Sequence, residues 1–169
     1  FTVWPTGGPR PVGANLITPA NRSVPNLAIV KVGEGGRVNV FNDIGETHAV
    51  VDVVGYFRTT AANRLQTVTP FRALDTRYGT GGRTTPLGPN QSYDVTVRGL
   101  GGVPTTADSV VVNVTVVGPT TPGFLTVWPA LQTRPLASNL NFVAGQIVPN
   151  LALAKVGTNN KISVYNPYG

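Results

Sequence analysis

The chain contains no cysteine and no methionine, has one histidine, and only 12% of its 169 residues are charged. Without cysteine there are neither disulfide bonds nor thiolate metal sites, so stability must come from packing and backbone hydrogen bonds. Because methionine is missing even at position 1, we expect that translation does not start at Phe1. No run of about 18 apolar residues occurs, and the sequence therefore predicts no membrane-spanning helix.

The scarcity of histidine and of acidic residues also limits catalysis and metal binding. Any Ser-His-Asp arrangement would depend on His48, which we interpret as a polar residue at the end of a strand. Two carboxylates set in apolar stretches, Asp52 and Asp75, are the only candidates for a hydrolytic pair. The acidic residues never occur at the Asp-x-Asp-x-Asp spacing of a calcium loop. We therefore predict that the chain is not an enzyme and holds no metal or cofactor.

The net charge of +6 is spread along the chain rather than gathered in one segment. The closest approach to a cluster is formed by Arg72, Arg77 and Arg83, and Asp75 lies among them. A nucleic-acid-binding protein usually carries its basic residues on one face or in one run, so we predict no nucleic-acid partner. Attraction to anionic cell-wall polymers would use the same charge and stays open.

The abundant residues are glycine, with 20, and proline, with 15, and they separate short segments in which apolar and polar residues alternate. Such segments are typical of β-strands that bury one face, and no stretch has the apolar spacing of a helix. The longest apolar segment of the first part, residues 48–57, is predicted as a central strand with Asp52 among its valines. We expect an all-β fold, an antiparallel, jelly-roll-like β-sandwich with about eight or nine strands per repeat.

One segment of the chain occurs twice. Residues 1–45 and 125–169 match without a gap at an offset of 124 residues, with 20 identities in 45 pairs. Both copies contain Thr-Val-Trp-Pro, Val-Pro-Asn-Leu-Ala and Lys-Val-Gly. An internal repeat of this period has the size of a domain, so the chain holds about one and a third copies of one unit.

The two copies belong to incomplete units. Residues 1–57 are predicted as the C-terminal part of one unit, residues 58–70 as a linker, and residues 71–169 as the N-terminal and middle parts of the next. An incomplete sandwich exposes sheet edges and half of its core. We therefore expect a neighbouring copy to complete each unit, in a tandem array, between chains, or within this chain.

Several repeated or strand-embedded polar residues are predicted to have structural roles. Asp75 and Arg77 lie two residues apart on the predicted strand 71–77, and we expect them to form an ion pair. Asp52 needs polar partners because a lone buried carboxylate is unfavourable. Two pairs of repeated asparagines should bond to backbone groups at turns or bulges; they are Asn15 with Asn139 and Asn26 with Asn150.

Two tryptophans precede proline at equivalent positions, and an arginine follows each of them six residues later. The pairs are Trp4 with Arg10 and Trp128 with Arg134. If the indoles are exposed, they would form a periodic platform on which sugar rings stack. If they are buried, they belong to the core.

The order of the motifs resembles a repeat of actinobacterial secreted and cell-surface proteins. The motifs that carry the resemblance are Phe71–Arg77, Gly102–Pro104, Val112–Thr115, Thr126–Pro129, Ser138–Asn141, Val148–Leu151 and Asp52–Phe57. The resemblance implies that Leu-Asp-Thr-Arg opens a unit and that Asp-Val-Val-Gly-Tyr-Phe closes it. It also implies an extracellular, non-catalytic module, often found beside wall-degrading or protease domains, and it carries no active-site residues.

These observations lead to two hypotheses of function. The first is a structural or adhesive repeat of an extracellular surface or filament protein, whose partners are neighbouring copies of itself. The second is a carbohydrate-binding accessory module of a secreted hydrolase, with a cell-wall or other polysaccharide as its ligand. Both predict a protein that works at the cell surface, without a membrane span.

Overall fold

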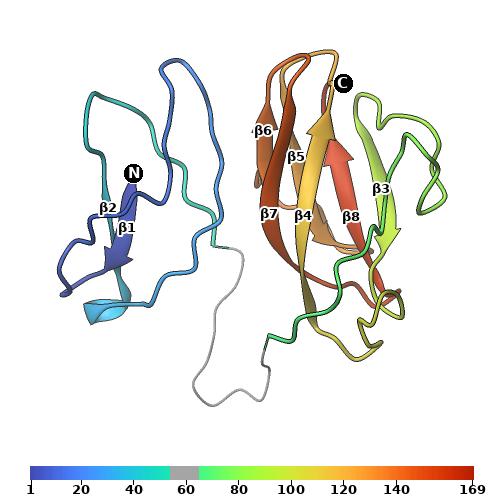
Figure 1. Cartoon of the computed structure of the whole chain (residues 1–169), viewed down its shortest axis with the longest axis horizontal. Coiled ribbons are helices and arrows are strands. Elements are labelled where there is room, and N and C mark those ends of the chain that lie inside the picture. The colour runs from blue at the N-terminus through green and yellow to red at the C-terminus, as the bar shows by residue number, and fades with distance from the viewer. Residues whose placement is uncertain (54–64) are drawn as a thin grey trace. The chain divides into compact units, whose positions relative to one another are not determined.

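The computed structural model describes residues 1–53 and 65–169, and the chain divides into two compact units, Phe1–Val51 and Asp52–Gly169 (Figure 1). The first unit contains strands β1 (Thr2–Pro5) and β2 (Val38–Phe41) and a short 3₁₀ helix, η1 (Glu34–Gly36). The second contains strands β3 (Gln91–Thr96), β4 (Ser109–Val117), β5 (Gly123–Pro129), β6 (Leu140–Phe142), β7 (Ile147–Lys155) and β8 (Lys161–Asn166). All strand pairs among the described residues are antiparallel, which confirms the predicted all-β class.

The second unit is built from two sheets. One has the strand order β3-β8-β5-β6, and the other pairs β4 with β7. Side chains of both sheets form one hydrophobic core; its strand residues are Val95, Val110, Leu125, Val127, Leu140, Phe142, Ala154, Ile162 and Val164. A core enclosed between two antiparallel sheets is the arrangement of a β-sandwich.

The burial of β4 follows the alternation in its sequence. Its even-numbered valines face the core, and its odd-numbered residues are exposed. Strand β8 differs because β3 and β5 flank it, and Ile162–Asn166 are buried on both faces. The buried hydroxyl of Ser163 donates a hydrogen bond of 2.5 Å to Asp94 of β3, so this polar group does not lack a partner.

The turn between β7 and β8 depends on a residue with positive φ. Asn160 has φ of 66°, and its backbone N–H donates to the carbonyl of Gly157 at 3.1 Å. Asparagine is one of the few side chains that adopt this left-handed conformation readily. The tight turn brings Lys161 back beside the strands that precede it.

The first unit repeats one strand pair of the second. β1 and β2 pair from Thr2 opposite Phe41 to Pro5 opposite Val38. The corresponding residues of β5 and β8 pair in the same register, from Thr126 opposite Tyr165 onward. The repeat in the sequence is therefore also a repeat in the structure, with the same offset.

The strand predictions for residues 48–53 and for residues 71–77 are wrong. Residues 48–53 are exposed and form no strand, so Asp52 does not lie among buried valines; residues 54–57 lie outside the described residues. Residues 71–77 form a loop in which Asp75 makes a single bridge to Thr80. Apolar alternation alone does not make a strand, because a strand also needs a partner for its backbone groups.

The division of the chain lies at Val51, within the predicted first segment 1–57. The predicted linker 58–70 is described only from residue 65 onward, and residues 65–70 contain no strand. Strand β3 starts at Gln91, so the loop segment that opens the second unit is long. Its fold depends on polar contacts, which are described below.

Candidate functional site

The first unit exposes apolar residues whose counterparts in the second unit are buried. The offset of 124 residues gives matched pairs in the same chain. The exposed fractions, first unit against second, are 60% against 4% for Val32 and Val156, 40% against 3% for Val38 and Ile162, and 46% against 8% for Val40 and Val164. We call Val32, Val38 and Val40 the uncovered face.

The uncovered face has a simple cause. In the second unit β3 pairs with the whole of β8, and β4 pairs with the whole of β7. The described part of the first unit has β2 as the counterpart of β8, but no counterpart of β3 or β4. Residues 23–31, the counterpart of β7, form no strand there. The unit therefore lacks the strands that would cover these valines.

The repeated asparagines fix the local structure in both units. In the first unit, the Asn15 side-chain oxygen accepts a hydrogen bond from the backbone N–H of Val3 at 2.7 Å. The Asn26 amide donates to the Asn15 carbonyl at 2.5 Å. The second unit has both bonds, with the same two lengths, from Val127 to Asn139 and from Asn150 to Asn139. These asparagines bond to backbone groups, as the sequence predicts, and their role is structural.

The repeated tryptophans and arginines are also packed against their own units. Trp128 is 8% exposed, and its indole N–H donates to the Gln132 carbonyl at 3.0 Å. The Arg134 guanidinium lies 3.6 Å from the centre of the Tyr165 ring. In the first unit the half-buried Trp4 donates to the Gly8 carbonyl, and Arg10 lies 3.8 Å from the centre of the Phe41 ring.

This packing bears on the sugar platform that the sequence allowed. The buried indole of Trp128 has no free ring face on which a sugar can stack, the indole of Trp4 is half-buried, and each arginine already covers an aromatic ring by a cation–π contact. Each tryptophan thus bonds to the turn that follows its own strand, and each arginine covers an aromatic ring of β2 or β8. No observation on these four residues favours a carbohydrate ligand.

The chain matches no family model, no curated protein and no solved structure. The likeness of its motifs to an actinobacterial surface repeat therefore stays a prediction from the sequence. The structure does show which contacts the two units share and which strands only the second unit has, and these differences bear on function.

The predicted ion pair of Asp75 is part of a larger cluster. Asp75 is buried, and its carboxylate accepts hydrogen bonds from Arg77 Nε at 2.9 Å, Arg77 Nη2 at 2.8 Å and the Arg77 backbone N–H at 3.1 Å. Arg72 Nη1 donates a further bond of 2.6 Å. These bonds, those of Arg77 above all, hold the pKa of the Asp75 carboxyl well below its usual range. The backbone N–H of Asp75 donates to Thr80, which closes the loop.

The pH dependence of stability follows from this shift. A carboxyl whose pKa is lowered by folding stabilises the fold above its unfolded pKa of about 3.9, and the stabilisation is lost as the pH falls through the folded pKa. We therefore expect Asp75→Asn to lower the midpoint of thermal unfolding at pH 7 and to flatten its dependence on pH below about 4. Thermal unfolding followed by circular dichroism between about pH 2 and 7 measures both effects.

Asp43→Asn provides the control, because Asp43 is exposed and belongs to the first unit. Its unfolding midpoints should follow those of the parent chain at every pH. A structural role for Asp75 is contradicted if Asp75→Asn and Asp43→Asn give the same curve.

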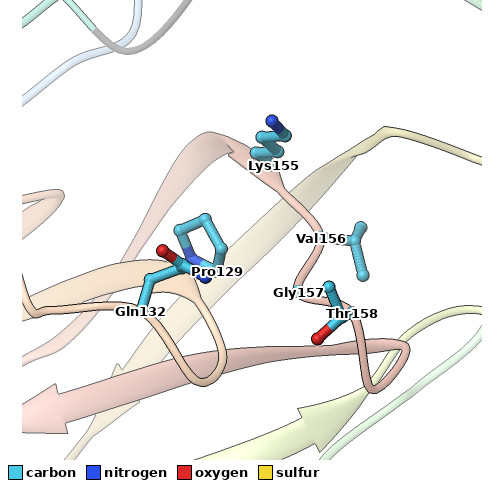
Figure 2. A pocket seen from close by; sticks show the side chains of 6 residues that line it. All are labelled: Pro129, Gln132, Lys155, Val156, Gly157 and Thr158. Atoms are coloured by element: carbon cyan, nitrogen blue, oxygen red, sulfur yellow. The ribbon is translucent and has the colours of Figure 1, made fainter.

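A shallow hollow lies beside the end of β5 (Figure 2). Its volume is 410 Å³, and it is lined by Pro129, Gln132, Lys155, Val156, Gly157 and Thr158. Figure 2 shows Pro129 and Gln132 on one side of it and Val156 and Thr158 on the other. At the offset of 124 residues, Lys155 corresponds to Lys31, whereas Gln132 corresponds to Gly8 and Thr158 to Glu34, so the polar lining recurs only in part in the first unit. The hollow has no set of converging polar groups that would bind a small molecule.

The residues considered for catalysis and metal binding are dispersed. His48 and Asp52 are exposed, and Asp75 is occupied by its arginines. Within residues 1–53 and 65–169, no three acidic or histidine side chains come together as a cation site would need. In the same residues, no helix has the length and apolarity to cross a membrane.

Sequence reasoning missed two features of the site. Arg72 joins the Asp75 cluster, and its spacing of three residues was the available signal. The stacking of arginine on Phe41 and Tyr165 was also missed, although an aromatic residue recurs at this position of the repeat. The uncovered face needed the structure, because only the comparison of the two units shows which positions stay exposed.

Proposed function

We propose that the chain is a non-catalytic structural repeat of an extracellular surface or filament protein, and that strands from neighbouring copies complete its units. The observation that carries the proposal is the uncovered face, because Val32, Val38 and Val40 are exposed where their counterparts are core residues. If these positions stayed exposed to water, the first unit would lack the apolar contacts that the same positions make in the core of the second unit.

Completion is favourable on two counts. Burying a valine fully stabilises a fold by about 1.5–3 kcal/mol relative to an exposed valine, and the uncovered face has three. Residues 23–31 also correspond in sequence to β7, but no neighbouring strand in the described part of the chain bonds to their backbone groups. A strand that pairs with them would supply backbone hydrogen bonds over most of that length. The missing elements are those that residues 71–123 provide in the second unit.

The work of such a repeat is mechanical: it sets spacing, displays other domains and adheres to surfaces. The location outside the cell rests on the resemblance of the motifs to surface repeats. The basic surface supports adhesion, since a net charge of +6 attracts anionic polymers such as those of cell walls.

The test is to supply the missing strands. A second copy of residues 71–124, joined directly to Phe1, reproduces the period of 124 residues. We expect residues 23–32 and 38–41 of the first unit to exchange their amide hydrogens at least about tenfold more slowly in this fusion than in the parent chain. Hydrogen exchange followed by mass spectrometry measures the change for each segment.

The control is the same fusion with Val95→Asp and Val112→Asp in the added copy only. These valines correspond to core positions of β3 and β4, so a charge at each should prevent the added strands from packing. Equal exchange of residues 23–32 in the parent chain and in the intact fusion would show that the first unit is not completed in this way.

A further inference from the structure

Strand β4 has one edge without a strand partner in the described part of the chain. Figure 1 shows β4 beside β7, and β7 is its only partner there. The N–H of Val156 bonds to the Asp108 carbonyl, and that of Gly118 bonds to the Gln146 carbonyl, each at 2.9 Å. Directly opposite residues of an antiparallel pair alternate between bonded and non-bonded. The even-numbered residues of β4 are therefore bonded to β7.

The odd-numbered residues of β4 direct their backbone N–H and C=O groups away from β7, toward the open edge. They are Ser109, Val111, Asn113, Thr115 and Val117. This edge is nine residues long and contains no proline. The far edge of β7 is different, because Pro149 lies opposite Thr115 and has no N–H to offer an added strand. The edge of β4 is thus the one that can accept a strand.

The same chain carries a segment that suits this edge. Residues 48–53, His-Ala-Val-Val-Asp-Val, are rich in β-branched side chains and form no strand. Val50, Val51 and Val53 are 87%, 68% and 87% exposed. In an extended strand, Val51 and Val53 share one face, and Val50 and Asp52 share the other. One face is therefore wholly apolar and the other carries a charge.

We propose that residues 48–53 of one copy add as a strand to the open edge of β4 in a second copy, with Val51 and Val53 facing the core. The inference deepens the proposed function and rests on it. Asp52 sets the orientation, because its carboxylate stays in water only if the apolar face points inward. The half-buried valines of β4, at positions 112, 114 and 116, lie at the margin of the core and gain cover from the added strand.

The contact joins different surfaces of the two copies. For this contact, the described part of each chain offers one donor segment, residues 48–53, and one acceptor edge, that of β4, so a chain bound through its donor still offers its acceptor. Contacts of this head-to-tail kind lead to open chains unless they close into a ring. The geometry thus gives a filament or array from a single type of contact.

The test is the mass of the assembled protein in solution. We expect the parent chain to exceed its monomer mass of 17.7 kDa as its concentration rises in analytical ultracentrifugation. Val51→Asp should weaken this association at least about tenfold, because it places a charge on the inward face. Val50→Asp is the matched control, since it adds the same charge on the outward face and should change the affinity less than about threefold.

The acceptor edge has its own variant. Thr115→Pro removes an outward N–H and leaves the bonds to β7 intact, as the proline opposite it already does. A mixture of Val51→Asp and Thr115→Pro retains one intact donor and one intact acceptor. It should form a dimer of twice 17.7 kDa and nothing larger. At concentrations at which the parent chain assembles, neither variant alone should assemble through this contact.

The contrast between positions 50 and 51 decides the question even if Thr115→Pro fails to fold, because neither valine lies in a strand. Equal effects of the two substitutions overturn the inference, and so does a parent chain that stays monomeric up to about 1 mM. If the fusion with residues 71–124 protects the first unit while Val51→Asp assembles like the parent, only the docking of residues 48–53 is overturned.

Discussion

Leu140→Ala is expected to lower the free energy of unfolding of the second unit by about 2–5 kcal/mol, the usual range for truncating a buried leucine. Leu140 is 0% exposed and lies in β6, where it packs in the core between the two sheets. Its removal leaves a cavity that neighbouring strands cannot fill, because the hydrogen-bonded pairing of β6 with β5 holds the backbone in place.

Leu16→Ala is the control that the repeat itself provides. Leu16 occupies the equivalent position of the first unit, is only half-buried, and lies in a unit with few buried residues. Its truncation should change the unfolding of the second unit by less than about 0.5 kcal/mol. Both variants are best made in a Trp4→Phe background, in which the fluorescence of Trp128 reports on the second unit alone during urea unfolding.

The result separates two views of the repeat. If Leu16 and Leu140 are equally costly to truncate, the first unit has a core of its own and needs no further strands. If only the truncation of Leu140 is costly, the first unit has the repeated local structure but no core of its own.

The sequence predicted those features that depend on local pattern. The gapless match of residues 1–45 to 125–169 implies equal registers, and β1–β2 and β5–β8 have them. Repeated asparagines predicted bonds to backbone, which recur with equal lengths in the two units. In these cases, the partners lie within about 40 residues of each other and recur together, so one copy of the pattern contains all that is needed.

The sequence could not predict which of two identical segments becomes a strand. Val-Pro-Asn-Leu-Ala occurs at 24–28 and at 148–152, and only the second copy lies in a strand. The difference is the presence of β4, which pairs with β7 along its whole length. Strand formation therefore depends on tertiary context that the segment itself does not encode.

The same limit explains why the predicted strand is absent from residues 48–53, the described part of the segment 48–57. Their valines match the pattern of a buried central strand, yet the described residues 48–53 are exposed. The pattern indicates that the segment can form a strand, but it does not indicate which sheet the strand would join. For the candidate site, the sequence thus predicts incomplete units, but it does not predict which positions are left uncovered.

Gly157→Ala is the second substitution with a large expected effect, a loss of about 3 kcal/mol or more in the free energy of unfolding of the second unit. A Cβ at Gly157 would lie 2.2 Å from the carbonyl oxygen of Ala130 and 2.9 Å from its nitrogen. Ala130 is 0% exposed, so neither backbone segment has room to move. Urea unfolding monitored by Trp128 fluorescence measures the loss.

The clash would fall on a junction that joins the two sheets. The Lys161 carbonyl accepts hydrogen bonds from Gly157 at 2.9 Å and from Ala130 at 3.3 Å, which ties the chain leaving β7 to the end of β5. The first unit has the same junction, in which the Arg37 carbonyl accepts from Gly33 at 2.9 Å and Thr6 at 3.3 Å. Both units thus keep it, with or without counterparts of β3 and β4.

Gly33→Ala is therefore the matched variant, since a Cβ there would lie 2.2 Å from the Thr6 nitrogen and oxygen. It should abolish the protection of residues 38–41 from hydrogen exchange and leave the unfolding of the second unit unchanged. If Gly157→Ala unfolds like the parent chain, the junction does not hold the sheets together. The same contact holds the β1–β2 pair in place. That result would therefore remove the main argument that the first unit is already folded to accept strands from another copy.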